Sequence, residues 1–191
     1  MSPVARVALV ALACVVAALP MPTGAQTGPA CPSGSGVVTS ATLGAPVMRE
    51  GQGLGAVDLG GSAADVRRAW GAPGECSPWQ RGYAYHYQLS DDGGQTSLLV
   101  VVMMQQDRVE QILATLLPHS GGRGPALRTS RGVAILAPVA EVRRAYGVHT
   151  LESQNALGYV AEGVAFQISR GVVGSILIFN AGAVPPGWRV L

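Results

Sequence analysis

A seven-residue phrase occurs twice in this chain of 191 residues, as DVRRAWG at positions 65–71 and as EVRRAYG at positions 141–147. The two copies lie 76 positions apart, and residues 57–83 align without a gap with residues 133–159 at that offset. Chance matches would not keep one register over such a length. The sequence therefore predicts two copies of one structural unit, each too small to bury its apolar side alone.

Each copy of the phrase has the features of a short amphipathic helix. Ser62 and Asp65 are typical of an N-cap and a first helical turn, and Pro138 also favours a helix start. Gly71 and Gly147 are expected to end the two helices. The apolar residues at helical spacing are Ala63, Val66, Ala69 and Trp70 in the first copy and Val139, Val142, Ala145 and Tyr146 in the second.

Alternating apolar residues predict three strands after each helix. The expected strands are 82–89, 97–104 and 108–116 in the first copy and 159–161, 164–169 and 172–180 in the second. The predicted fold class is α+β, with two tandem repeats. Each repeat is a short helix followed by a three- or four-stranded antiparallel sheet, and two units side by side bury more than one.

The rest of the chain is divided by composition. Residues 1–25 resemble a secretory signal peptide, because Arg6 precedes an apolar run that is too short for a membrane span and ends in small residues. An uncleaved anchor and a lipid anchor on Cys14 are the alternatives. No membrane span is expected after cleavage. The expected segments are a flexible extension at 26–47, repeat 1 at 48–117, a linker at 118–125, repeat 2 at 126–183 and a tail at 184–191.

The two cysteines that follow the signal peptide are Cys31 and Cys76. A secreted or periplasmic chain reaches an oxidising compartment, where such cysteines pair. The sequence favours a disulfide that fixes the extension to the first repeat. Free thiols or an intermolecular bridge are the alternatives.

Charge and motifs exclude several function classes. The formal net charge is only +2, too low for a nucleic-acid-binding surface, and the chain has no Lys, which excludes Schiff-base chemistry. His86, His119 and His149 are far apart and lack metal-ligand spacing. No nucleophile motif or phosphate loop is present. We therefore expect neither a cofactor, a metal site nor an enzymatic activity.

Three groups of residues are candidates for a binding surface. Tyr83, Tyr85 and Tyr87 share one face of a predicted strand, where they form either core or an exposed aromatic platform that Trp79 and Trp188 could extend. Asp91 and Asp92 lie at a predicted hairpin tip. The two arginine pairs either bind anions or lie on a solvated helix face: Arg67, Arg68, Arg143 and Arg144.

The first helix also carries a spaced motif, made of Gly60, Ser62, Val66 and Gly71. With the repeated helix-and-sheet unit, this motif resembles the β-lactamase inhibitor protein family and, more distantly, small lipoproteins of outer-membrane assembly. The resemblance implies a concave sheet and hairpin tips that contact a target enzyme. Leu136 and Pro138 depart from the motif in the second unit, and the chain offers one disulfide where the inhibitors have two.

The sequence as a whole favours a secreted, non-enzymatic protein-binding module that uses its sheet face and hairpin loops. One alternative is an assembly or structural component of the cell envelope. Another is an inhibitor of a secreted hydrolase such as a β-lactamase, which rests on architecture alone. The ligand and the oligomeric state are left open.

Overall fold

The structure is a computed structural model that describes residues 31, 34–44, 46–90, 96–117, 127–153 and 155–191. The described chain is α+β and is mostly sheet. Its helices are α1 (Ser40–Leu43), α2 (Ala63–Trp70) and α3 (Val139–Tyr146). Its strands are β1 (Val37–Thr39), β2 (Val47–Arg49), β3 (Gly53–Leu54), β4 (Val57–Asp58), β5 (Glu75–Trp79), β6 (Gly82–Ser90), β7 (Thr96–Gln105), β8 (Arg108–Leu116), β9 (Arg128–Thr129), β10 (Leu151–Ser153), β11 (Ala156–Tyr159), β12 (Val164–Ser169), β13 (Val172–Phe179) and β14 (Arg189–Val190).

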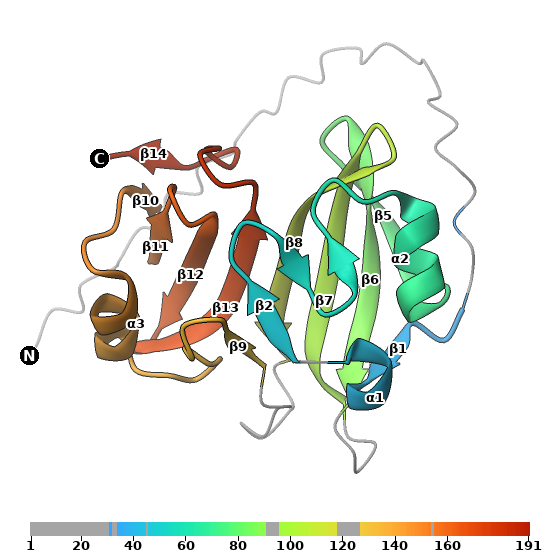
Figure 1. Cartoon of the computed structure of the whole chain (residues 1–191), viewed down its shortest axis with the longest axis horizontal. Helices are drawn as coiled ribbons and strands as arrows, with labels where there is room; N and C mark the ends of the chain where they lie inside the picture. Colours follow the sequence, from blue (N-terminus) through green and yellow to red (C-terminus); the bar gives the residue numbers. More distant parts are fainter. Residues whose placement is uncertain (1–30, 32–33, 45, 91–95, 118–126, 154) are drawn as a thin grey trace, which may run out of the picture.

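Ten strands form one large sheet in the order β1-β6-β7-β8-β13-β12-β11-β10-β14, with β5 also paired to β6. Strands β5 to β8 supply one half and strands β10 to β13 supply the other (Figure 1). The halves meet where β8 pairs antiparallel with β13, from Gln111 opposite Phe179 to Thr115 opposite Ser175. One continuous sheet therefore joins residues far apart in the sequence.

Two short strands share the outer edge of β6. Strand β5 pairs antiparallel with residues 82–86, and β1 pairs in parallel with residues 88–90. The backbone approach between them is close, because a Cβ on Gly36, which has φ 61°, would overlap the backbone of Gly74. Cys31 and Cys76 form a disulfide with a Cα–Cα distance of 5.9 Å, which confirms the predicted pairing.

One side of the large sheet is covered by the helices and by a small second sheet with the order β4-β3-β2-β9. Figure 1 shows α2 over one end, α3 over the other and the small sheet between them. The main apolar core lies beneath these elements and includes Tyr87, Val102, Ile112, Phe166 and Ile178, none more than 2% exposed. We call this side of the large sheet the covered face.

Both predicted helices are present and end where the sequence indicates. Ser62 and Asp65 form a capping box at the start of α2, in which each side chain bonds the other residue's backbone N–H. At the ends of the helices, the Gly71 and Gly147 N–H groups donate to the carbonyls of Arg67 and Arg143, each over 2.9 Å. Gly71 has φ 81° and Gly147 has φ 77°, conformations that favour glycine.

The two halves agree in one contact that the ungapped alignment does not predict. The Tyr87 hydroxyl donates to the Gly71 carbonyl over 3.0 Å, and the Tyr159 hydroxyl donates to the Gly147 carbonyl over 3.4 Å. The strand pairing agrees with this contact. Glu75 and Leu151 are 76 positions apart, and Glu75 lies opposite His86 whereas Leu151 lies opposite Gly158. Tyr87 and Tyr159 are the residues that follow these two partners. Tyr159 therefore makes the contact that Tyr87 makes, whereas Tyr83, with which Tyr159 aligns in sequence, donates to Asp107 over 2.7 Å.

The N-terminal and C-terminal parts of the described chain differ from the prediction. The range 26–47 was expected to be flexible, yet from residue 34 onward it contains β1, α1 and the start of β2. Val38 and Leu43 lie in the core at 2% and 1% exposed, which offsets the entropy of ordering this segment. The tail at 184–191 contains β14, which pairs with β10. The predicted signal peptide and linker lie outside the described residues.

Candidate binding face of the large sheet

The tyrosine row does not form an exposed platform. Tyr85 and Tyr87 are 1% and 0% exposed and Tyr83 is partly buried, because α2 packs on the side of β6 from which they project. Trp70 of α2 meets Tyr87 edge to face with ring centroids 5.4 Å apart. Burial raises the pKa of Tyr83 and Tyr87 above the usual tyrosine range, so both hydroxyls stay protonated. The three rings are core, and the platform interpretation is wrong.

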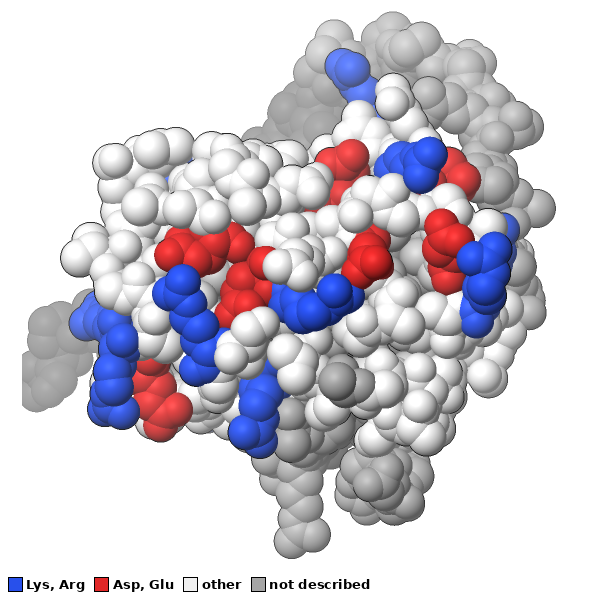
Figure 2. Space-filling view, viewed as in Figure 1, with Lys and Arg blue, Asp and Glu red and all other residues white. Residues whose placement is uncertain are grey.

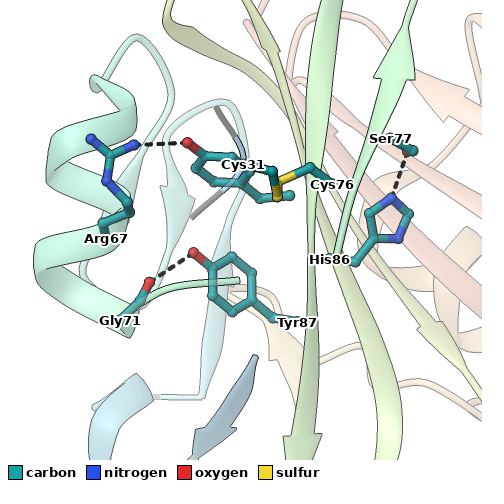
Figure 3. The surroundings of a disulfide bond; sticks show 8 residues. Cys31, Arg67, Gly71, Cys76, Ser77, His86 and Tyr87 are labelled. Carbon is teal, nitrogen blue, oxygen red and sulfur yellow. Dashed lines mark hydrogen bonds between the residues drawn. A yellow bond between two sulfur atoms is a disulfide. The ribbon is translucent and has the colours of Figure 1, made fainter. Parts of the chain in front are cut away.

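The four arginines of the repeated phrase have different surroundings. Arg67 points inward and donates to the Tyr85 hydroxyl over 2.7 Å (Figure 3). The expected position on a solvated helix face is therefore wrong for this residue. Arg68 is exposed and pairs with Asp65 over 2.6 Å. Arg143 and Arg144 are exposed on α3. The two arginine pairs therefore do not form two matched sets of contacts. Asp91 and Asp92 lie outside the described residues.

The other side of the large sheet, opposite α2, α3 and the small sheet, carries three rows of side chains, of which one runs from β6 to β13 and two run from β6 to β11. Cross-strand pairing brings these residues together, although the sequence separates them widely. We call this surface the open face. Its rows are Ala84-Met103-Gln111-Phe179, then His86-Val101-Leu113-Leu177-Ala165-Gly158, and then Gln88-Leu99-Thr115-Ser175-Gln167-Ala156.

The open face is apolar and has no Asp, Glu or Arg in these three rows. Leu99, Leu113 and Leu177 are partly exposed on it, with the less exposed Val101 and Met103 beside them. Charged side chains lie at its border, where Glu75 of β5 is opposite His86. Figure 2 shows acidic and basic groups next to one another on the side that carries the helices. The two sides of the molecule therefore differ in chemistry.

Two tryptophans border the open face. Trp79 of β5 packs against the Ala84, Val101 and Met103 cluster at one end. Trp188 of the C-terminal segment packs against Leu151, Ala165 and Phe179 at the other end. The sequence suggested both residues as extensions of a tyrosine platform, and the structure places them on the opposite side of the sheet from Tyr85 and Tyr87.

Several polar groups on or beside the open face are hydrogen-bonded. Ser175 donates to the Thr115 hydroxyl over 2.8 Å, and its hydroxyl lies 3.5 Å from the Gln167 amide oxygen. At the β5 edge, the Ser77 hydroxyl and the His86 ring nitrogen Nε2 lie 2.7 Å apart, a contact that joins β5 to β6 (Figure 3). Neutral hydrogen-bonding groups are therefore present within an apolar surface.

Sequence reasoning missed the open face, although one signal marks it. An antiparallel sheet with one solvated side alternates apolar and polar residues. The stretches 98–104 and 176–179 are apolar at both alternating positions. Such runs indicate strands that carry apolar side chains on both faces of the sheet. The open face therefore has the composition of a surface that packs against another group.

On the covered side, a polar network ties the small sheet to α3. The Glu50 carboxylate accepts hydrogen bonds from the Tyr146 hydroxyl and from the Arg131 backbone N–H. The Arg131 guanidinium lies 4.7 Å from the centre of the Tyr146 ring and pairs with Glu162 over 3.5 Å. Burial alone would raise the pKa of Glu50, but hydrogen bonds from Ser130, Tyr146 and Arg131 outweigh it and hold this pKa below 4.5.

Replacing Glu50 with glutamine is expected to lower the free energy of unfolding by about 1 kcal/mol at pH 7. Because the folded pKa lies below the usual value of 4.5, the carboxylate stabilises the fold above that pH and loses this effect as pH falls through the folded pKa. The gap between wild type and Glu50→Gln should therefore narrow below pH 4.5, as measured by urea unfolding. Glu141→Gln, at an exposed carboxylate of α3, is the control. A gap that is constant with pH would contradict this assignment.

No protein-family model matches the chain, and a search of curated proteins finds no significant match. Among solved structures it is similar to the crystal structure of a cysteine-rich secretory protein from Staphylococcus aureus subsp. aureus Mu50, at 12% identity over 80% of this chain with a TM-score of 0.45. The chain spans 57% of the length of that protein chain. A likeness this distant carries no argument about fold or function, and the resemblance to the inhibitor family stays a prediction.

Proposed function

We propose that this protein is a non-enzymatic protein-binding module that contacts its partner through the open face of the large sheet. We also propose that it is built from two copies of one helix-and-sheet unit. The repeated phrase, the matched glycine ends of α2 and α3, and the equivalent bonds of Tyr87 and Tyr159 support the duplication. Side by side, the two units form a sheet wide enough to bind another protein.

The observation that carries this proposal is that the three rows of the open face have no Asp, Glu or Arg and carry apolar side chains at their centre. Soluble proteins rarely leave large contiguous apolar patches in water unless the patch binds something. The cores of protein interfaces are depleted in charged residues and enriched in aromatic residues and methionine. Leu113 and Leu177 at the centre, Met103 beside them and the two bordering tryptophans match that composition.

The proposed partner is outside the cytoplasm. The Cys31–Cys76 disulfide is compatible with an extracellular or periplasmic location, where disulfides persist. Within the described part of the chain, no helix has the length and apolar character needed to cross a bilayer. The signal-like residues 1–25 point to the same compartment.

The test is chemical cross-linking of the protein in culture medium and in envelope fractions, with partners identified by mass. Leu113→Asp and Leu177→Asp place a charge at the centre of the open face and should each reduce a specific cross-link at least about tenfold. Arg144→Asp, on α3, is the matched control and should leave that cross-link unchanged. Circular dichroism and urea unfolding confirm that each variant folds.

Loss of the cross-link in Arg144→Asp, with retention in both leucine variants, would overturn the proposal. The fraction that holds the partner separates the alternatives. A partner in the medium favours a diffusing binder, whereas one found only in the envelope favours an assembly component. Inhibition of a secreted hydrolase that is lost in Leu113→Asp would identify the inhibitor function.

A further inference from the structure

We propose that a hollow on the open face beside Trp188 accepts one uncharged aromatic or branched aliphatic side chain of the partner. This inference rests on the proposed function and adds the chemistry of the group that the partner presents. The hollow has a volume of about 230 Å³. It is lined by Leu113, Ala156, Ala165, Gln167, Ser175, Leu177 and Trp188.

Residue size along the sheet produces the hollow. Ala165 carries a small side chain opposite Leu177, and Ala156 carries one opposite Gln167. The leucines at 113 and 177 form one wall, and Trp188 forms the opposite wall. A depression with a floor of small residues and walls of this kind can hold an inserted side chain, as the anchoring pockets of protein interfaces do.

Trp188 is held in place by several contacts. A Cβ on Gly158 would lie 3.1 Å from Cζ3 of Trp188, so the glycine allows the indole to lie close to the sheet. The segment that carries Trp188 is fixed on one side by the pairing of β14 with β10 and on the other by a Trp188 N–H to Pro185 carbonyl bond of 3.2 Å. The wall is therefore preformed, which reduces the entropy cost of binding.

Volume and polarity select the ligand class. A pocket for a small molecule usually has about 300–1,000 Å³, so this smaller hollow fits a single side chain better. The lining contains no charged residue, and its polar groups are the neutral Gln167 and Ser175. An inserted carboxylate or guanidinium would lose its hydration without gaining an opposite charge. An uncharged apolar side chain avoids this cost, while Gln167 can bond to the adjacent peptide backbone.

Two other hollows fit this class less well. The one at the β1 and β5 edge is lined by Glu75 and His86 among backbone glycines, so it is polar and contains a charge. The one beneath the C-terminal segment is lined by Glu110, Gln105 and Gln111 as well as Trp79, and has about 110 Å³. Of these three hollows, the one beside Trp188 combines a neutral lining with a rigid aromatic wall.

The test is an NMR titration of the full chain with N-acetyl-L-phenylalanine amide, N-acetyl-L-leucine amide and N-acetyl-L-aspartic acid amide. The first two should give saturable shifts of the Trp188 indole N–H and of the Leu177 and Gln167 amides, and the aspartate compound should bind at least about tenfold more weakly. Trp188→Ala and the filling variant Ala156→Leu should each weaken binding at least about tenfold. Val148→Ala, at an exposed position just after α3, should leave it unchanged.

Three results would overturn the inference: no saturable shift with either apolar probe, equal binding of the aspartate compound, or equal weakening in Val148→Ala. The NMR titration can fail independently of the cross-linking test of the proposed function. Probe binding at Trp188 without any open-face cross-link would reject the proposed function and keep the hollow as a binding site. A cross-link that depends on Leu113, without probe binding, would reject the hollow alone.

Discussion

Replacing Tyr87 with alanine is expected to lower the free energy of unfolding by about 3 to 5 kcal/mol. The side chain is fully buried and packs edge to face on Trp70. Its hydroxyl donates to the carbonyl of Gly71, the residue that ends α2, so the substitution removes both the packing of the helix and a bond that satisfies its end. Urea unfolding followed by far-ultraviolet circular dichroism measures the change.

Two variants test the reason for this loss. Tyr87→Phe keeps the ring and removes only the hydroxyl, so it should cost about 1 kcal/mol. Gln88→Ala, at the neighbouring exposed position of the same strand, should cost less than about 0.5 kcal/mol. If Tyr87→Ala unfolded at the same urea concentration as wild type, Tyr87 would not be the core contact between β6 and α2.

Removing the disulfide with the double substitution Cys31→Ala and Cys76→Ala is expected to cost about 4 kcal/mol in the chain-entropy account. The bond closes a segment in which the cysteines are 45 positions apart, so the unfolded chain of wild type is strongly constrained. In the folded state the bond holds the segment that leads into β1 against β5. The loss should therefore exceed that of a typical single surface substitution several-fold.

Unfolding of the oxidised protein and of the double variant under the same conditions measures this effect, and reduced wild type should match the double variant. Hydrogen exchange gives a second readout, because the Gln88 N–H that donates to the Gly36 carbonyl should lose protection when β1 is released. Equal stability of the oxidised and variant proteins would show that the bond does not constrain the chain.

The sequence predicts the helices and the longest strands well, because their signals are local. Capping residues mark the start of α2 and glycines mark the ends of α2 and α3, while turn residues bound β8, β12 and β13. The shorter strands β3, β4, β9 and β14 have two residues each, too few to show a period. Their positions depend on pairing with distant segments.

Alternation of residues along a strand does not predict which side of the sheet the helices cover. The pattern shows that Tyr83, Tyr85 and Tyr87 share a face of β6, but whether α2 covers that face depends on how the helix packs. The same limit applies to Arg67, whose aliphatic stem and charged head reach a buried hydroxyl from the edge of the helix. The candidate site was missed for this reason, since its rows exist only once strands from both halves pair.

The β8–β13 junction has a consequence for the order of folding. Thr115 and Ser175 lie opposite each other across it although 60 positions separate them, whereas the β7–β8 and β12–β13 hairpins close over short turns. Contacts between positions far apart in the sequence have a larger entropy cost of loop closure and form more slowly. The hairpins are thus expected to form first and to dock along this seam afterwards, so the open face is completed only in the final stage of folding.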